Sequence, residues 1–235
     1  MDIYVGTSGW AYFWNPDGLD WYIRFSGLNA VELNASFYRF PYPNQVKSWA
    51  RKSESSRLRW AVKIHRSITH RRVLGESSFE IMGRFLQRME PLDPYIDFYL
   101  AQLPPRVKPT THFLQNLERF SDRVDLGWRL AVEFRSLEWF REEWVDRLRG
   151  LQITYVSVDS PQTTFLGRSG PYTYLRLHGR SAWYSHLYST EELHEICERI
   201  IRLGGDAAYV FFNNDHGMLQ NSREALILLR NIAKA

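Results

Sequence analysis

The feature that most constrains the fold of this chain is the alternation of strand-like and helix-like patterns along its whole length. Eight short segments carry apolar side chains or alternate them with polar ones, and helical periodicity separates most of these segments. The expected strands are Ile3–Gly6, Ala30–Asn34, Leu58–Ile64, Tyr95–Leu103, Trp128–Phe134, Gln152–Asp159, Tyr172–His178 and Ala207–Phe212. This pattern predicts an α/β fold with a parallel sheet.

The expected helices lie between these strands. The clearest begins after Ser189, which forms a capping box with Glu192, and ends before Gly204. The others are Asn44–Arg51, Ser77–Met89, Thr111–Phe120, Leu137–Leu148 and Ser222–Ile232. The segment after the sixth strand, residues 160–171, is expected to be a loop in place of a full helix.

Eight strands with intervening helices in 235 residues match the size and pattern of a (β/α)8 barrel. We therefore expect residues 1–235 to form a single barrel domain. A doubly wound open sheet is the alternative, and its dinucleotide-binding version has no support because no Gly-x-Gly-x-x-Gly follows the first strand.

The composition excludes some classes of protein. No apolar run approaches the roughly 20 residues of a membrane-spanning helix, and no basic leader precedes the first strand, so we expect a cytoplasmic protein without a membrane partner. The single cysteine, Cys197, cannot form an internal disulfide and is interpreted as a core residue. The net charge of +4 would suit an anionic partner without requiring one, and no protein partner is predicted.

Arg176 stands in the polar phase of its strand, opposite Leu175 and Leu177. If the leucines pack on helices, the guanidinium points into the barrel, where an unpaired charge would be very costly, so carboxylates on other strands must be near. The same inward phase at the strand ends contains Glu32, Asn34, Lys63, His65, Glu133, Arg135, Asp159, Arg176 and His178, to which we add Gln102 and Asn213. Three carboxylates in this set balance three cations.

This set is compatible with several kinds of chemistry. Arg135 or Arg176 could hold a phosphate or carboxylate, Glu32 or Glu133 could act as the general base, and His178 as the acid. A buried ion network that only satisfies itself is the structural alternative. The candidate catalytic residues are Glu32, Glu133, His178, Lys63 and Asp159.

A divalent metal is a less favoured alternative for this set. Glu, Asp and His are suitable ligands, but no compact motif such as His-Glu-x-x-His is present, and the neighbouring cations would repel a metal ion. We therefore predict no metal ligand and identify no cofactor. A Schiff base at Lys63 is weaker still, because nearby carboxylates would keep the amine protonated.

The expected loops around the strand ends combine aromatic and basic side chains. Aromatic platforms beside arginines could stack on nucleotide bases or on sugar rings, and core or lid packing is the structural alternative. The candidate substrate-binding residues are Asn34, Gln102, Arg135, Arg176, Asn213, Trp10, Tyr38 and Trp183. Loop histidines such as His65 and His70 are each interpreted as ordinary surface or core residues.

Ordered motifs along the chain also resemble a known family. They are Gly6-Thr-Ser-Gly-Trp10, Glu32-Leu-Asn-Ala-Ser-Phe-Tyr38, Val62-Lys63, Ile68-Thr-His70, Gln102-Leu-Pro-Pro105, Val132-Glu-Phe-Arg135, Tyr174-Leu-Arg-Leu-His-Gly179 and Phe211-Phe-Asn-Asn-Asp215. They resemble the YecE-like family, domain of unknown function seventy-two. The resemblance implies a TIM-type barrel, similar to the xylose-isomerase-like and endonuclease IV-like enzymes, without a settled activity. The full zinc-ligand set of endonuclease IV-type enzymes has no clear equivalent here.

The leading hypothesis is an enzyme, of hydrolase or nuclease type, that acts on a phosphorylated or polyanionic substrate at the strand ends. Its partner would be a small anionic ligand or nucleic acid. A carbohydrate isomerase or lyase is the second enzyme class. A nucleic-acid-binding module without chemistry is the alternative outside enzymes.

Overall fold

The computed structural model describes residues 1–234, which divide into two compact units. The first unit comprises residues 1–32 and the described residues from 156 onward, and the second comprises residues 33–155. Both are built mainly from parallel strands and helices, and the chain has the (β/α)8-barrel fold that the sequence predicts. None of the helices within residues 1–234 combines the length and the apolar character needed to cross a bilayer.

The first unit is organised around the first and last strands of the chain. Its strands are β1 (Asp2–Thr7), β2 (Ala30–Leu33, without its last residue), β6 (Thr154–Ser160, from residue 156), β7 (Thr163–Phe165), β8 (Tyr172–Leu177) and β9 (Ala207–Phe212). β1 pairs in parallel with β2 and β9, and β8 pairs with β9 and β6. A Cβ at Gly6 would lie 2.2 Å from Ala30 O, so the pairing of β1 with β2 requires glycine there.

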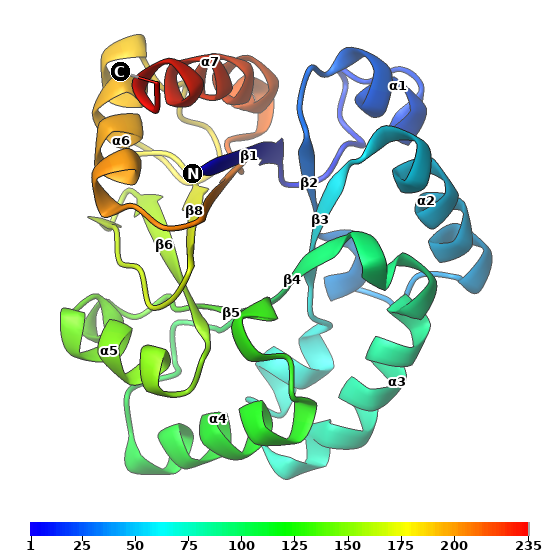
Figure 1. Ribbon diagram of the computed structural model, residues 1–235. Coiled ribbons are helices and arrows are strands. Elements are labelled where there is room, and N and C mark those ends of the chain that lie inside the picture. Colours follow the sequence, from blue (N-terminus) through cyan, green and yellow to red (C-terminus); the bar gives the residue numbers. More distant parts are fainter. Residues whose placement is uncertain (235) are drawn as a thin grey trace. The chain divides into compact units, whose positions relative to one another are not determined.

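Three helices belong to this unit, α1 (Gly18–Phe25), α6 (Thr190–Leu203) and α7 (Met218–Ile232), with a 3₁₀ turn η7 (Asp215–Gly217) before the last. α6 and α7 pack against each other, and α7 covers β1 and β9 (Figure 1). The capping box of Ser189 and Glu192 begins α6 as the sequence predicts. Leu193, Ile196 and Ile200 of α6 are buried with Val210 of β9, and these residues form part of the core of the unit.

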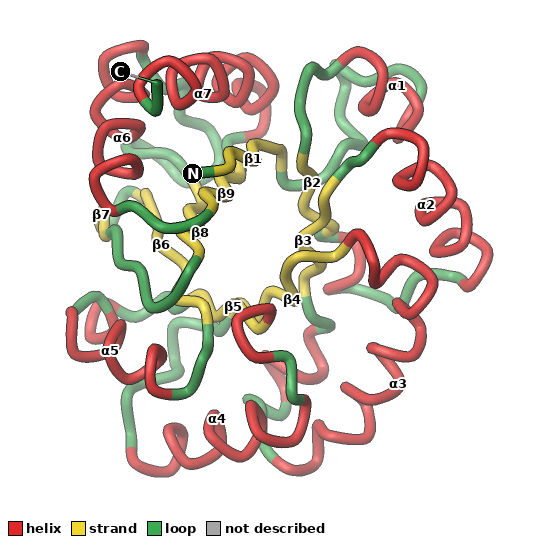
Figure 2. The backbone as a smooth tube through the Cα atoms, in the orientation of Figure 1, coloured by secondary structure: helices red, strands yellow, loops and turns green. Residues whose placement is uncertain are grey.

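The second unit contains β3 (Arg59–Lys63), β4 (Ile96–Gln102) and β5 (Leu130–Glu133), and β5 continues its pairing with the first residues of β6. Its helices are α2 (Pro43–Ser56), α3 (Phe79–Met89), α4 (Thr111–Val124) and α5 (Glu142–Gly150). Shorter turns are η1 (Ala35–Phe37), η2 (Ser67–Arg71), η3 (Glu76–Ser78), η4 (Glu90–Tyr95), η5 (Gly127–Arg129) and η6 (Leu137–Trp139). The helices lie on one side of the neighbouring strands β3, β4 and β5 (Figure 2).

Some sequence-based boundaries were wrong. The sequence pattern did not indicate α1, which is only eight residues long and buries only Leu19 and Tyr22. The segment after β6 has no helix, as predicted, but it contains the short strand β7, which pairs antiparallel with β6. α5 begins at Glu142 because Leu137–Trp139 forms the 3₁₀ turn η6, and α7 begins one turn before Ser222, at Met218.

Candidate functional site

Glu32, at the end of β2 in the first unit, is fully buried and is held by several donors. Arg176 Nη2 lies 2.5 Å from its Oε1, Ser8 Oγ donates to the same oxygen over 2.8 Å, and Tyr174 OH donates to Oε2 over 2.9 Å. β8 supplies both Tyr174 and Arg176, which stand two residues apart and therefore on the same face of the strand. The structure thus brings Arg176 to a carboxylate, as the strand pattern requires.

Arg176 is as deeply buried as its partner, with a side-chain exposure of 1%. Its Nη2 also lies 3.5 Å from Ser8 Oγ, so the guanidinium, the hydroxyl and the carboxylate form one network. An ion pair that is removed from water needs such additional hydrogen bonds to offset the cost of desolvation. The arrangement orients Glu32 through Tyr174 and Ser8 as well as through the charge of Arg176.

Asp159, near the end of β6, is also fully buried, and its partners come from β7 and from the segment that follows β8. Tyr188 OH donates to Asp159 Oδ2 over 2.6 Å, Arg180 Nε lies 3.3 Å from Oδ1, and Thr164 Oγ1 donates to Oδ1. Tyr188 OH in turn accepts a hydrogen bond from Gly179 N over 2.9 Å. Asp159 therefore fixes the loop between β8 and α6.

The sequence pattern balanced Asp159 against the inward cations Lys63, Arg135 and Arg176. In the structure Arg180 is an ion-pair partner of Asp159, and its Nη1 also donates to Glu195 over 2.8 Å. The reason is the turn at Gly179, where φ is +105° and a Cβ would lie 2.5 Å from Ala182 O, which directs the chain back toward β6.

His178 is buried at the end of β8, beside Asn213 from the end of β9. Asn213 Nδ2 and His178 Nδ1 are 3.1 Å apart, an arrangement in which the amide donates and Nδ1 accepts. Trp183 and Tyr184 lie near the imidazole, with ring centroids 5.5 Å and 5.9 Å away. The structure therefore gathers these three sequence candidates, His178, Asn213 and Trp183, into one cluster of the first unit.

Glu133 and Arg135 lie at the end of β5 in the second unit. Glu133 is fully buried, Arg135 is 12% exposed, and Arg135 Nη2 lies 2.7 Å from Glu133 Oε1. Two residues apart, they project from the same side of the strand end. A buried carboxylate therefore orients the guanidinium of a side chain that remains slightly exposed.

A second group of cations lies near His70 in the same unit. Lys63 Nζ lies 4.4 Å from the centroid of the Phe37 ring, and the same ring meets His70 edge-on at 4.8 Å. Arg106 Nη2 donates to the carbonyl oxygen of His70. Burial and the positive charges of Lys63, Arg106 and Arg135 together lower the pKa of His70 to about 4.

The backbone that carries His70 is irregular. Ser67–Arg71 is a π-helical turn, a conformation that often marks functional sites. Val73 and Leu74 follow it with φ of +49° and +60°, which bulky and especially β-branched side chains rarely adopt. Leu74 is fully buried and its N–H donates to Ile68 O over 3.1 Å, so packing holds the strained turn in place.

The amide candidates of the second unit occupy different positions. Among the described residues, Asn34 Oδ1 is buried and accepts no hydrogen bond. Gln102 Nε2 donates to the carbonyl oxygen of Leu103 over 2.7 Å at the end of β4. Asn34 is thus the amide candidate whose carbonyl oxygen can accept a hydrogen bond from a ligand.

The two other aromatic candidates lie in loops. Trp10, half-buried in the first unit, accepts a hydrogen bond from Asn15 Nδ2 at its backbone oxygen over 2.6 Å. Tyr38, in the second unit, is 65% exposed, with the guanidinium of Arg66 6.0 Å from its ring centroid. Tyr38 is therefore an exposed aromatic ring beside a cation.

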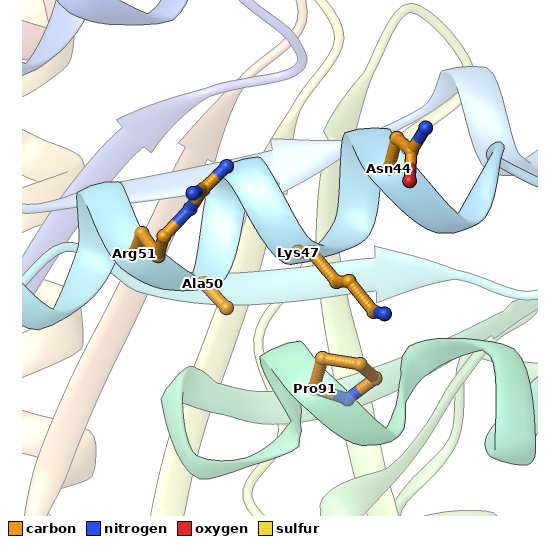
Figure 3. Close-up of a pocket in the computed structure, with 5 residues that line it drawn as sticks. All are labelled: Asn44, Lys47, Ala50, Arg51 and Pro91. Atoms are coloured by element: carbon orange, nitrogen blue, oxygen red, sulfur yellow. The ribbon is translucent and has the colours of Figure 1, made fainter.

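Within residues 1–234, no group of three or more His, Cys, Asp or Glu side chains is arranged to hold a metal ion. A groove of about 420 Å³ lies between α2 and η4, lined by Lys47, Arg51 and Pro91 among others (Figure 3). This groove contains none of the candidate residues. Lys47 and Arg51 of this groove are exposed cations of the second unit that lie outside the candidate site.

Sequence reasoning missed several residues of these clusters. Ser8, Tyr174 and Tyr188 are hydroxyl donors to buried carboxylates, and nothing in their local pattern shows which acid they reach. His70 was interpreted as an ordinary histidine, and Arg106 was not considered. The position of His70 in the loop after a barrel strand was the available signal.

Comparisons with known proteins agree with the fold and the motifs. A family model described as "Protein of unknown function DUF72" matches residues 4–234. The chain belongs to this family. The UPF0759 protein YecE of Escherichia coli O157:H7 is 32% identical over 167 residues, which cover 67% of this chain and 59% of that relative. The match thus spans about three-fifths of the relative's length.

Solved structures of the DUF72 family show the same fold. A DUF72 family protein from Thermotoga maritima MSB8 is 31% identical, with a TM-score of 0.82 over 99% of each chain. A D-psicose 3-epimerase is 14% identical, with a TM-score of 0.66 over 100% of each chain, a likeness that concerns the fold alone. The family and the barrel predicted from the sequence are therefore confirmed.

Proposed function

We propose that this DUF72-family protein is an enzyme that binds a phosphorylated or polyanionic substrate at the C-terminal ends of β3 and β5. The observation that carries the proposal is the group of cations near His70. Lys63 lies 4.4 Å from the Phe37 ring that contacts His70, and Arg106 donates to the carbonyl oxygen of His70. With Arg135, their charges add to burial in lowering the pKa of His70. The potential at this position is therefore positive, which favours an anion. The ends of barrel strands are also where enzymes of this fold place their active sites.

The side chains around His70 suit the recognition of phosphate. Arg135 is held by Glu133 and is 12% exposed, so its guanidinium is oriented before a ligand arrives. Lys63 provides a second cation above the Phe37 ring. Asn34 Oδ1, which has no hydrogen-bond partner among the described residues, is the acceptor that this proposal assigns to a hydroxyl or amide of the substrate.

Two groups of this cluster can move protons. His70 is neutral at pH 7 because its pKa is lowered to about 4, and a neutral imidazole can act as a base or as a hydrogen-bond donor. Glu133 is a buried carboxylate beside the anion-binding guanidinium and is the candidate general base. In this proposal Arg135 and Lys63 bind the substrate, whereas Glu133 and His70 act on it.

The proposal assigns a different role to the Glu32 cluster. Arg176 is almost wholly buried and bound to Glu32, so it orients that carboxylate and does not serve as the anion clamp that the sequence suggested. Asp159 likewise holds the loop after β8 through Tyr188 and Arg180. In this proposal both clusters stabilise the conformation of the strand ends in the first unit.

Isothermal titration calorimetry with inorganic pyrophosphate tests the binding step. Lys63→Gln and Arg106→Gln should each weaken binding by about tenfold, because each removes a charge next to the anion. Arg147→Gln is the matched control, since it removes an exposed cation of the same unit that pairs with Glu118. Equal affinity in all four proteins would contradict the proposal.

The catalytic step is tested with Glu133→Gln and a panel of phosphate monoesters, phosphate diesters and single-stranded DNA. An enzyme of the proposed kind should turn over a member of the panel, and Glu133→Gln should lose this turnover while pyrophosphate still binds. A non-catalytic nucleic-acid-binding module would instead bind DNA with a steep salt dependence and show no turnover in either protein. Turnover of neutral sugars alone would favour the isomerase or lyase class.

A further inference from the structure

A second basic pocket lies in the second unit, between the end of β3, the π-helical turn η2 and α3. It has a volume of about 610 Å³, and its lining includes Phe40, His65, Arg72, Arg84, Gln87 and Arg88. This volume lies within the range of roughly 300–1,000 Å³ that is typical of small-molecule sites. Lys63, His70, Arg106 and Arg135 of the proposed substrate site are not among its lining residues.

The three arginines of this pocket retain most of their hydrogen-bonding capacity. Arg88 Nη1 donates to Pro41 O over 2.6 Å, and Arg72 Nη1 donates to Ser67 O over 3.2 Å. Among the described residues, Arg84 has only a 3.9 Å contact between its Nε and Oε1 of Glu80, which is 85% exposed. Each guanidinium carries five N–H donors, so Arg72 and Arg88 are positioned by one bond and keep the others for a ligand.

His65 forms a neutral wall of the pocket. Its Nδ1 accepts a hydrogen bond from Ser67 N over 3.2 Å, so Nε2 carries the proton and donates to Tyr38 O over 3.2 Å. Burial and the charges of Arg66 and Arg71 lower the pKa of His65. Both ring nitrogens are hydrogen-bonded within the protein. The imidazole therefore forms part of the pocket wall, and the arginines are the groups that can bind the charge of a ligand.

The pocket also has an apolar side. Phe40 is half-buried, with its ring edge-on to His65 at 5.1 Å and to Phe85 at 5.2 Å, and Ile81 of α3 lines the same cavity. The contacts with His65 and Phe85 fix the Phe40 ring in position. A flat or apolar group can therefore lie against Phe40 while an anionic group meets the arginines.

We propose that this pocket binds a small phosphate-bearing molecule whose aromatic or apolar part lies against Phe40. Arg72, Arg84 and Arg88 hold the phosphate, and Gln87 can hydrogen-bond a polar substituent. The site is separate from the strand-end cluster around His70. The pocket therefore provides a second binding site, in addition to the site of the proposed reaction.

The test uses the full chain with phenyl phosphate as the probe and follows ¹H–¹⁵N chemical shifts. The amides of Ile81, Gln87 and Ser67 should shift on titration. Arg84→Glu should weaken binding by about tenfold or more, because it places a negative charge in a pocket built from cations. Arg51→Glu is the matched control, because it makes the same charge change on α2, beside the other groove (Figure 3).

Phe40→Leu separates recognition of the ring from recognition of the phosphate. Phe40→Leu should weaken the binding of phenyl phosphate and leave the affinity for inorganic phosphate unchanged. Lys63→Gln should change the affinity of this pocket for neither probe. An equal loss in Arg84→Glu and Arg51→Glu would mean general electrostatic attraction and would overturn the proposal. Tighter binding of short oligothymidylate than of phenyl phosphate at the same amides would also overturn it in favour of a polynucleotide.

Discussion

Arg176 Nη2 lies 2.5 Å from Glu32 Oε1, and the two side chains are 1% and 0% exposed. They come from β8 and β2, 144 residues apart in the sequence. Tyr174 and Ser8 donate to the same carboxylate, so the pair is hydrogen-bonded as well as neutralised. A charge pair buried this deeply has a large effect on stability when only one member is removed.

Arg176→Met should lower the free energy of unfolding by about 3–5 kcal/mol, because it leaves the Glu32 carboxylate buried without its counter-charge. Urea denaturation followed by circular dichroism measures the change. The double variant Glu32→Gln with Arg176→Met should recover part of the loss, since neither charge is then buried. Additive losses in the double-mutant cycle would show that the two residues are not coupled.

Tyr188→Phe should lower the free energy of unfolding by about 1–3 kcal/mol. The change removes the donor to Asp159 Oδ2 and also the acceptor of the Gly179 N–H, so both groups lose a buried partner. Tyr184→Phe is the matched control in the same loop, because Tyr184 is 40% exposed, and it should change stability by about 0.5 kcal/mol or less. Equal effects of the two substitutions would argue against the role of the Asp159 network.

The sequence contained enough information for the fold because strand phase and helix caps are local properties. The expected strand Ala207–Phe212 matches β9 at both ends, and the capping box at Ser189 begins α6. The same reasoning predicted that Arg176 needs a carboxylate, and the structure provides Glu32. Periodicity places such side chains on the correct face of each strand.

The ion-pair and hydrogen-bond partners of these side chains could not be predicted, because the conformations of the loops determine which groups meet. Arg180 reaches Asp159 through the turn at Gly179, and Arg106 reaches His70 from a segment without periodicity. The π-helical turn at Ser67–Arg71 also has no recognisable pattern in the sequence. The sequence therefore predicted which strand ends carry charge, but not which pairs those charges form.

Cys197 should be unreactive in the native protein. Its side chain is buried in α6, and burial, with a smaller contribution from Glu224, raises the pKa of the thiol to about 12. Ellman's reagent at pH 8 should therefore release no colour from the folded protein and one equivalent of thiolate after denaturation in guanidinium. A rapid reaction of the folded protein would show that α6 opens locally or packs differently.

His70 should titrate far below an ordinary histidine, with a pKa of about 4 against an ordinary value of 6.5. The unfolded chain therefore binds a proton at a higher pH than the folded chain, so the contribution of neutral His70 to stability is present above pH 6.5 and declines as the pH falls toward 4. Two-dimensional NMR of the imidazole protons measures the pKa directly. His70→Gln should reduce the loss of unfolding free energy between pH 7 and pH 5.

The same titration tests the link between His70 and anion binding. Lys63→Gln should raise the pKa of His70, because it removes one of the cations that oppose protonation. The surface change Arg147→Gln should leave it unaltered, since Arg147 does not contribute to the shift. Bound pyrophosphate should raise the pKa of His70 further than Lys63→Gln does, since its negative charge stabilises the imidazolium. A pKa that does not respond to saturating pyrophosphate would place the anion away from His70 and contradict the proposed substrate site.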